Sequence, residues 1–150
     1  MGRQARSVLV GGVFHVTARA VFEHPLFADD ADRHGFIHIF RTLEAEGEVE
    51  CLAYCLMSTH YHLLLAGRAE QLGGFMKRLN GRYAQRFNRR HHRHGHVFAE
   101  RYTSRVVCGE AHLDDVYAYI AANPAKAGLC DGREPWPWTW TGGSRDGGTD

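Results

Sequence analysis

The chain is organised around the stretch MSTHYHLLL, residues 57–65, in which two histidines flank a tyrosine and three leucines follow. The aromatic and leucine side chains on both sides favour an extended conformation. Residues two apart in a strand project from the same face, so we expect His60 and His62 to point together. Two adjacent imidazoles are a usable pair of metal ligands. Taken alone, the pattern also fits two partly buried structural histidines, and the rest of the chain has to decide between these interpretations.

Length and composition are those of one globular domain. The sequence has 150 residues, 44% hydrophobic and 23% charged, and we interpret residues 1–150 as a single domain with a frayed tail over about 141–150. No apolar run approaches the roughly 20 residues of a membrane span. The N-terminus lacks a signal peptide's apolar segment, and the four cysteines form no C-x-x-C pair. These features predict a cytoplasmic protein without a membrane partner.

The basic residues are unevenly distributed along the chain. The segment from Arg68 to Arg105 carries ten Lys or Arg against two Asp or Glu, so its net charge is +8 while the remainder carries −7. A basic segment in an otherwise acidic chain is typical of contact with a nucleic-acid backbone, although a solvated helix surface is the simpler alternative. The nucleic-acid contacts that we predict are Lys77, Arg78, Arg82, Arg86, Arg89, Arg90, Arg101 and Arg105.

Hydrophobic periodicity predicts the element order β-α-β-β-α-β, followed by a third helix. This is the order of the ferredoxin-like (split βαβ) α+β fold, an antiparallel sheet with helices on one face. The Asn123-Pro124 pair is expected to stop the third helix, and three tail tryptophans to fold back on the core. The predicted strands cover 8–20, 49–57, 61–66 and 97–107, and the predicted helices cover 31–46, 70–90 and 113–122.

Tyr83 lies on the apolar stripe of the second predicted helix and is surrounded by arginines. A core tyrosine is the simplest interpretation, and a nucleophile beside a metal held by His60 and His62 is the functional one. A phenol with a pKa of about 10 is a poor nucleophile when protonated. A divalent ion and nearby arginines would stabilise the phenolate. Its attack on a phosphodiester would give a phosphotyrosyl ester, which keeps the bond energy and lets the strand be rejoined without ATP.

Three sequence blocks resemble the single-tyrosine HUH transposases, and among them the REP-associated tyrosine transposase-like proteins of bacteria. They are FHVT (14–17), CLMSTHYHLL (55–64) and FMKRLNGRYAQRFNRR (75–90). The resemblance extends over roughly residues 8 to 140 because shorter motifs follow in the same order. These are GHVF (95–98), RYTSR (101–105), Tyr119-Ile120, Asn123-Pro124 through Ala127-Gly128-Leu129, and Pro137-Trp138.

This resemblance implies an HUH-nuclease type of fold and a metal-dependent activity on DNA. The implied enzyme is an endonuclease and strand transferase that acts on single-stranded DNA at hairpin-forming palindromes, through a 5′-phosphotyrosyl intermediate and with Mg²⁺ or Mn²⁺. Its partner would be single-stranded or hairpin DNA, and its location the nucleoid. A homodimer, in which the tyrosine serves the partner's histidines, is left open.

The resemblance also assigns the site residues. His60 and His62 correspond to the family's metal ligands and Tyr83 to its nucleophile. Related transposases carry an amide side chain one helical turn beyond the tyrosine, but Phe87 stands at that position here. We assign the third ligand to Asn88 from the family pattern, with Asn80 as the alternative that helix geometry favours.

Two alternatives to the cleaving and joining enzyme remain at this stage. One is a module that recognises a nucleic-acid hairpin without cutting it. The other is a metal-dependent hydrolase in which water attacks the phosphate and the tyrosine is structural.

Overall fold

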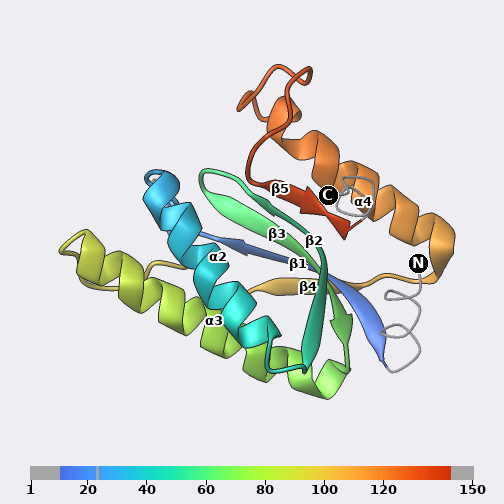
Figure 1. Cartoon of the computed structure of the whole chain (residues 1–150). Helices are drawn as coiled ribbons and strands as arrows, with labels where there is room; N and C mark the ends of the chain where they lie inside the picture. The colour runs from blue at the N-terminus through green and yellow to red at the C-terminus, as the bar shows by residue number, and fades with distance from the viewer. Residues whose placement is uncertain (1–10, 23, 143–150) are drawn as a thin grey trace.

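The computed structural model describes residues 11–22 and 24–142. Five strands form one antiparallel sheet in the order β4-β1-β3-β2-β5, and three helices pack on it (Figure 1). The ferredoxin-like α+β architecture is therefore confirmed. The strands are β1 (Gly12–Arg19), β2 (Val49–Leu56), β3 (His60–Gly67), β4 (Thr103–Val106) and β5 (Thr139–Thr141), and the helices are α2 (Asp30–Glu44), α3 (Ala69–Arg90) and α4 (Gly109–Lys126).

Strict alternation along β3 divides its side chains between two hydrophobic cores. Tyr61, Leu63 and Leu65 belong to the core beneath α2 and α3, whereas Leu64 and Ala66 belong to the core beneath α4. Because successive side chains of a strand point to opposite faces, the two cores lie on opposite faces of the sheet. The two long helices share one face, as predicted, and α4 covers the other (Figure 1).

The start of α2 is tied to the end of α3 by charge. Asp29 caps α2 by accepting a hydrogen bond from the backbone N–H of Asp32. Arg90, at the last position of α3, donates to both carboxylates at 2.7–2.8 Å. Asp32 is 1% exposed and also meets His91. This end of the two-helix layer is thus held by a paired, partly buried charge cluster.

Two local predictions differ from the structure, and two more segments cannot be compared with it. Helix α4 continues through Pro124, because a proline in the final turn costs only one backbone hydrogen bond. Of the strand predicted over residues 97–107, only Thr103–Val106 pairs regularly with β1, while Phe98 forms an isolated bridge. The part of the first predicted strand before residue 11 and the tail beyond residue 142 lie outside the described residues.

The C-terminal tryptophans fold back on the sheet, as predicted, and build a strand that was not predicted. Strand β5 pairs with β2, and Trp140 stacks on Tyr54. The Trp136 indole N–H donates to the backbone carbonyl of Leu56 at 2.9 Å. Arg33, from α2, lies over the Trp136 ring. No helix in the described part of the chain is long and apolar enough to cross a membrane.

Candidate active site

The two histidines of the HYH motif lie on the face of the sheet covered by α4. Strand pairing sets Thr17 opposite His62 and Arg19 opposite His60. Directly paired residues of antiparallel strands share a face, so these four side chains form one polar surface. The imidazole rings of His60 and His62 are 5.1 Å apart, as the sequence predicts for side chains two residues apart in a strand.

The ring of His62 is held by its neighbours on β1. Its Nδ1 atom lies 3.0 Å from Nε2 of His15 and 3.2 Å from Oγ1 of Thr17. When Nδ1 of His62 carries the proton and donates to His15, Nε2 keeps its lone pair. His62 is only 4% exposed. The two β1 side chains therefore fix the orientation of the His62 ring and occupy its Nδ1 atom, which leaves Nε2 on the side of a ligand.

Helix α4 brings a tyrosine and an amide to the same histidines. The ring of Tyr119 stands at right angles to that of His62, with centroids 5.5 Å apart, and is 5.9 Å from that of His15. One turn further along, Nδ2 of Asn123 lies 3.4 Å from Nε2 of His62. Residues four apart on a helix share a face. Tyr119 is 47% exposed, so its phenol is open to a substrate.

Both motif histidines are neutral at physiological pH. Burial, followed by the charge of Arg19, lowers the pKa of His60 to about 4. Burial, followed by His60, His15 and Arg19, lowers the pKa of His62 to about 3. Burial also lowers the pKa of His15, as do the charges of Arg105 and His112. Neutral imidazoles keep the nitrogen lone pairs that metal binding requires.

The donor set fits a divalent cation. His60 and His62 supply two imidazole nitrogens, and the Asn123 amide supplies an oxygen when it turns that atom toward them. Across the described residues, no three His, Cys, Asp or Glu side chains form a metal-binding group. The protein ligands would thus be two imidazoles and one amide, with the Tyr119 side left for a substrate oxygen.

Two arginines flank this surface along the strands. Arg19 pairs with His60 across β1 and β3, and Arg105, on the edge strand β4, pairs with His15. Both side chains are exposed, and both influence the pKa values of the site histidines. Of these two, Arg105 was among the predicted nucleic-acid contacts and Arg19 was not. The strand alternation that groups Arg19 with His15 and Thr17 could have identified it.

The structure does not bring Tyr83, the predicted nucleophile, together with the motif histidines. Its side chain is fully buried in the core beneath α2 and α3, on the opposite face of the sheet. Its hydroxyl donates to the backbone carbonyl of Leu26 at 2.6 Å. Burial raises the pKa of Tyr83, which disfavours the phenolate. The error came from setting the apolar stripe of α3 over the histidines, when that stripe packs on Tyr61, Leu63 and Leu65.

Neither asparagine proposed as the third ligand lies at the histidines. Asn88 donates to the backbone carbonyl of Gly95 and accepts from Arg93 in the turn after α3. Asn80 accepts a hydrogen bond from the hydroxyl of Tyr61, on the α2–α3 face. Asn123 meets the expected pattern of an amide one turn beyond a tyrosine, with Tyr119 as that tyrosine. The four-residue spacing of Tyr119 and Asn123 is visible in the sequence and could have identified both residues.

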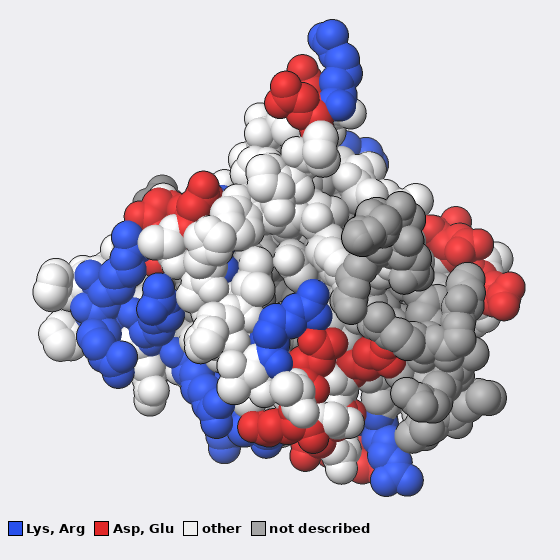
Figure 2. Space-filling model, viewed as in Figure 1, with Lys and Arg blue, Asp and Glu red and all other residues white. Residues whose placement is uncertain are grey.

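The predicted basic contacts divide into paired and unpaired side chains. Arg78 bonds Glu48 at 2.8 Å and Arg90 bonds Asp29 and Asp32, so these charges are already compensated within the chain. Arg86 donates to the backbone carbonyl of Ala31. In Figure 2 the Lys and Arg side chains gather along the left and lower left of the molecule, where Figure 1 has α3. The exposed members of the predicted set are Lys77, Arg82, Arg89, Arg90, Arg101 and Arg105.

The fold and this surface define a class, an antiparallel α+β domain whose sheet carries a histidine pair beneath a helix-borne tyrosine and amide. Residues 10–123 match the profile of the family described as transposase IS200-like. That match covers most of the chain, so the protein belongs to the IS200-like transposase family.

Solved structures agree on the fold. A structure described as a REP-associated tyrosine transposase bound to a REP hairpin matches with a TM-score of 0.71 and 14% identity, over 87% of this chain and 76% of that one. A candidate transposase from Deinococcus radiodurans R1 matches with a TM-score of 0.53 and 22% identity, over 72% of this chain and 87% of that one. None of the curated proteins compared matches this chain.

Proposed function

We propose that this protein is a metal-dependent transposase that cuts and rejoins single-stranded DNA at hairpin-forming palindromes, with Tyr119 as its nucleophile. The observation that carries the proposal is the convergence of Tyr119 and Asn123 from α4 on His62 of the HYH motif, within one chain. Membership of the transposase family supports the reaction class. The REP hairpin bound to the structurally similar transposase supports hairpin DNA as the partner.

The reaction is a transesterification. The phenolate oxygen of Tyr119 attacks the scissile phosphorus, the bond from phosphorus to the 3′ oxygen breaks, and that oxygen leaves with a proton as a 3′ hydroxyl. The 5′-phosphate stays on Tyr119 as an ester, and attack by a 3′ hydroxyl reverses the step and joins a strand. Because one phosphate ester replaces another, no ATP is needed.

The other side chains of the site would bind the metal ion, orient its ligands and neutralise phosphate charge. His60, His62 and Asn123 would bind a divalent ion, Mg²⁺ or Mn²⁺, which when bound supplies Lewis-acid polarisation of the phosphate. His15 and Thr17 orient His62 through its Nδ1 atom. Arg19 and Arg105 would neutralise phosphates on either side of the reacting centre. The exposed ring of Tyr119 meets the strand without a rearrangement of the core.

The test makes the same substitution at two tyrosines, one on each face of the sheet. With a labelled hairpin oligonucleotide and Mn²⁺, the wild-type protein should form a covalent protein–DNA adduct that survives a denaturing gel. Tyr119→Phe should reduce the adduct by about 10³-fold or more, because no other side chain can replace the nucleophile. Tyr83→Phe should still form it.

Three outcomes would contradict the proposal. If Tyr83→Phe lost the adduct and Tyr119→Phe kept it, the nucleophile would be on the other face. Cleavage by Tyr119→Phe without an adduct would point to water as the nucleophile. Wild-type protein that binds the hairpin and never cuts it would be a recognition module.

A further inference from the structure

A cleft of about 560 Å³ lies between the second half of α4 and the loop that leads to β5. The loop covers residues 127–138 and lies at the same end of the molecule as the last turn of α4 (Figure 1). Three alanines and Lys126 line the cleft on the helix side, and Pro135 and Trp136 line it on the loop side. Its volume is that of a small-ligand site, roughly 300–1,000 Å³.

The indole of Trp136 forms a fixed wall of this cleft. Its N–H donates to the backbone carbonyl of Leu56 at 2.9 Å, and the guanidinium of Arg33 lies over the ring, 5.3 Å from its centroid. The side chain is partly exposed, so the rest of the ring is open toward the cleft. A ring held in this way loses little freedom when a ligand binds, and aromatic rings are the usual platforms for unpaired bases.

The loop side of the cleft is joined to the strands that carry the motif histidines. Leu56, which accepts from the Trp136 indole, is the last residue of β2. The N–H of the next residue, Met57, donates to the backbone carbonyl of His60 at 2.9 Å. The cleft therefore lies at the end of the sheet where His60 begins β3.

The helix side of the cleft is joined to the proposed nucleophile. Lys126 follows Tyr119 by seven residues on α4. At 100° and 1.5 Å per residue, it lies about 20° from Tyr119 around the helix axis and about 10 Å further along it. Tyr119 and Lys126 thus share one face of α4. A strand that leaves Tyr119 along this face reaches the cleft within about three nucleotides, at about 3.4 Å or more per nucleotide.

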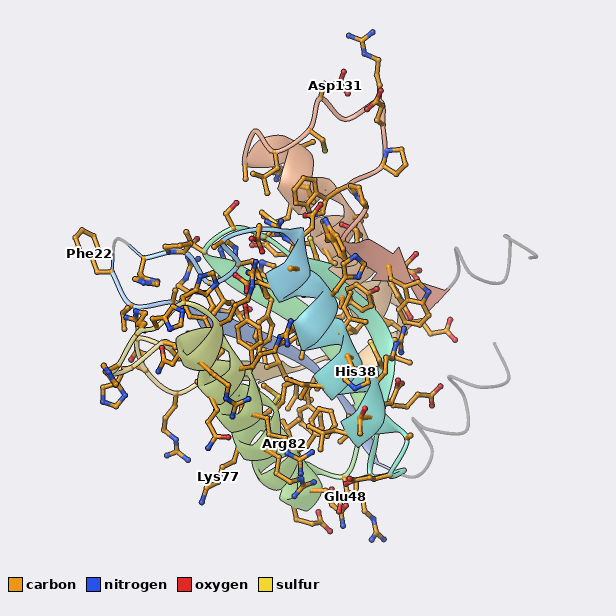
Figure 3. The ribbon with its side chains drawn as sticks, turned by 60° about the vertical axis from the view of Figure 1, so that its left-hand side comes forward. Phe22, His38, Glu48, Lys77, Arg82 and Asp131 are labelled. Carbon is orange, nitrogen blue, oxygen red and sulfur yellow. The ribbon has the colours of Figure 1, made fainter. Side chains whose placement is uncertain are left out.

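The charges of the cleft suit a nucleotide. Lys126 is exposed and forms no hydrogen bond or ion pair with the described residues. Arg133, the other cation of the lining, is already opposed at 3.8 Å by Asp131, which Figure 3 shows at the outer end of the loop. The carboxylate of the lining, Glu134, can accept a hydrogen bond from the exocyclic amino group of a base. Lys126 is therefore the cation available to a phosphate.

We infer that this cleft binds one unpaired nucleotide of the strand that the Tyr119 site cleaves. The base packs against Trp136 and the alanines of α4, and Lys126 contacts an adjacent phosphate. The inference rests on the proposed function and gives the strand a second point of attachment, which fixes its position along α4. A paired base cannot enter, because its faces and its pairing edge are occupied in a duplex. The cleft thereby selects single-stranded DNA.

A series of 2-aminopurine oligonucleotides tests the inference without cleavage. The probe is the single-stranded flank of the hairpin, with the fluorescent base at one position at a time and divalent metal left out. At one position, or at two adjacent ones, binding of the protein should lower the fluorescence at least about threefold, because stacking on an aromatic ring quenches this base. An abasic site at that position should weaken binding about tenfold.

Variants of the cleft identify the residues that hold the base. Ala121→Leu fills the cleft from an exposed helix position about 160° away from Tyr119 around the axis. It should remove the quenching and weaken flank binding about tenfold, and an abasic site should then cost nothing more. Ala111→Leu makes the same change on α4 outside the cleft and should have no effect. Trp136→Leu should match Ala121→Leu, whereas Trp136→Phe should keep most of the binding, because it keeps a ring although it loses the bond to Leu56.

The phosphate contact is tested by salt dependence. Lys126→Gln should lower the slope of log affinity against log salt by about 0.7 for the flank, which is the contribution of one contact to a single strand. Arg68→Gln removes one exposed charge at the start of α3 and should leave that slope unchanged. Thermal unfolding of each variant reports on its fold.

Four outcomes would overturn the inference. They are the absence of any quenched position, quenching that survives both Ala121→Leu and Trp136→Leu, a loss with Trp136→Phe as large as with Trp136→Leu, and an equal loss for a blunt duplex with the stem sequence. The third would make the indole N–H a structural contact only.

Mapping of the covalent adduct separates this inference from the proposed function. The quenched base should lie within about three nucleotides of the phosphate linked to the protein, and a larger separation would contradict the placement of the cleft beside the reaction. If no adduct forms while one base still depends on Ala121 and Trp136, the proposed reaction fails and the nucleotide site stands.

Discussion

Two helix-borne tyrosines approach the same sheet from opposite faces and differ in every property that chemistry needs. Tyr83 is fully buried, and its hydroxyl is bonded to the backbone carbonyl of Leu26. Tyr119 is 47% exposed and stands against the rings of His62 and His15. The difference is set by the strands beneath them. Leucines beneath α3 seal one face, while on the other face the histidines, Thr17 and Arg19 form a polar surface beside the core beneath α4.

After the two Tyr→Phe substitutions, the largest expected difference between the two faces comes from removing the amide of Asn123. Asn123→Ala should weaken Mn²⁺ binding by about 10- to 100-fold, because a donor at His62 is lost. Electron paramagnetic resonance of free Mn²⁺, in a titration without DNA, measures the affinity of each variant for the ion and does not depend on catalytic activity. His62→Ala should weaken binding at least as much.

Asn88→Ala is the matched control, since it removes the same side chain from the last turn of α3, away from the histidines. It should leave Mn²⁺ affinity unchanged. If Asn88→Ala weakened Mn²⁺ binding and Asn123→Ala did not, the metal site would not lie on the α4 face.

Much of this arrangement could be predicted from local sequence, and the part that could not depends on long-range pairing. The HYH spacing predicted that His60 and His62 point together, as the structure has them. The alternation of side chains along a strand over residues 8–20 is likewise enough to place His15, Thr17 and Arg19 on one face. Which helix covers that surface is not a local property. Both α3 and α4 carry a tyrosine and apolar residues, and only the burial of Leu63 and Leu65 beneath α3 assigns the histidines to α4.

Two sequence signals could have corrected the assignment. An amide stands four residues after Tyr119, at Asn123, whereas Phe87 stands four residues after Tyr83. Leu63 and Leu65 also alternate with His62, so an apolar helix packed on those leucines cannot cover that histidine. The extension of α4 through Pro124 and the pairing of β5 with β2 had no comparable signal, because both depend on contacts made by the folded tail.

Tyr83 is expected to contribute more to stability than Tyr119, although Tyr119 is the one expected to be needed for activity. Tyr83→Phe should lower the free energy of unfolding by about 1–3 kcal/mol, because the buried carbonyl of Leu26 loses its donor. Tyr119→Phe, which removes an exposed hydroxyl, should change it by less than about 0.5 kcal/mol. Urea unfolding followed by circular dichroism measures both. An equal loss in the two variants would mean that Tyr119 is also a structural residue.

The smallest expected effect concerns the cations that flank the open face. Arg19 is exposed, lies beside His60 and forms no ion pair that the described residues show, so its charge is available to a phosphate. One phosphate contact to single-stranded DNA contributes about 0.7 to the slope of log affinity against log salt. Arg19→Gln should therefore reduce that slope by about 0.7 for the single-stranded flank and lower its affinity about threefold at physiological salt. It should leave binding of a blunt duplex without a flank unchanged, because the surface beneath α4 is proposed to bind the single strand. Arg133→Gln controls for net charge, because this side chain is 89% exposed and lies 3.8 Å from Asp131, which is 60% exposed. If Arg19→Gln weakened binding of the duplex and of the flank equally, Arg19 would contact DNA of either form and would not be specific to the single strand that the proposed reaction uses.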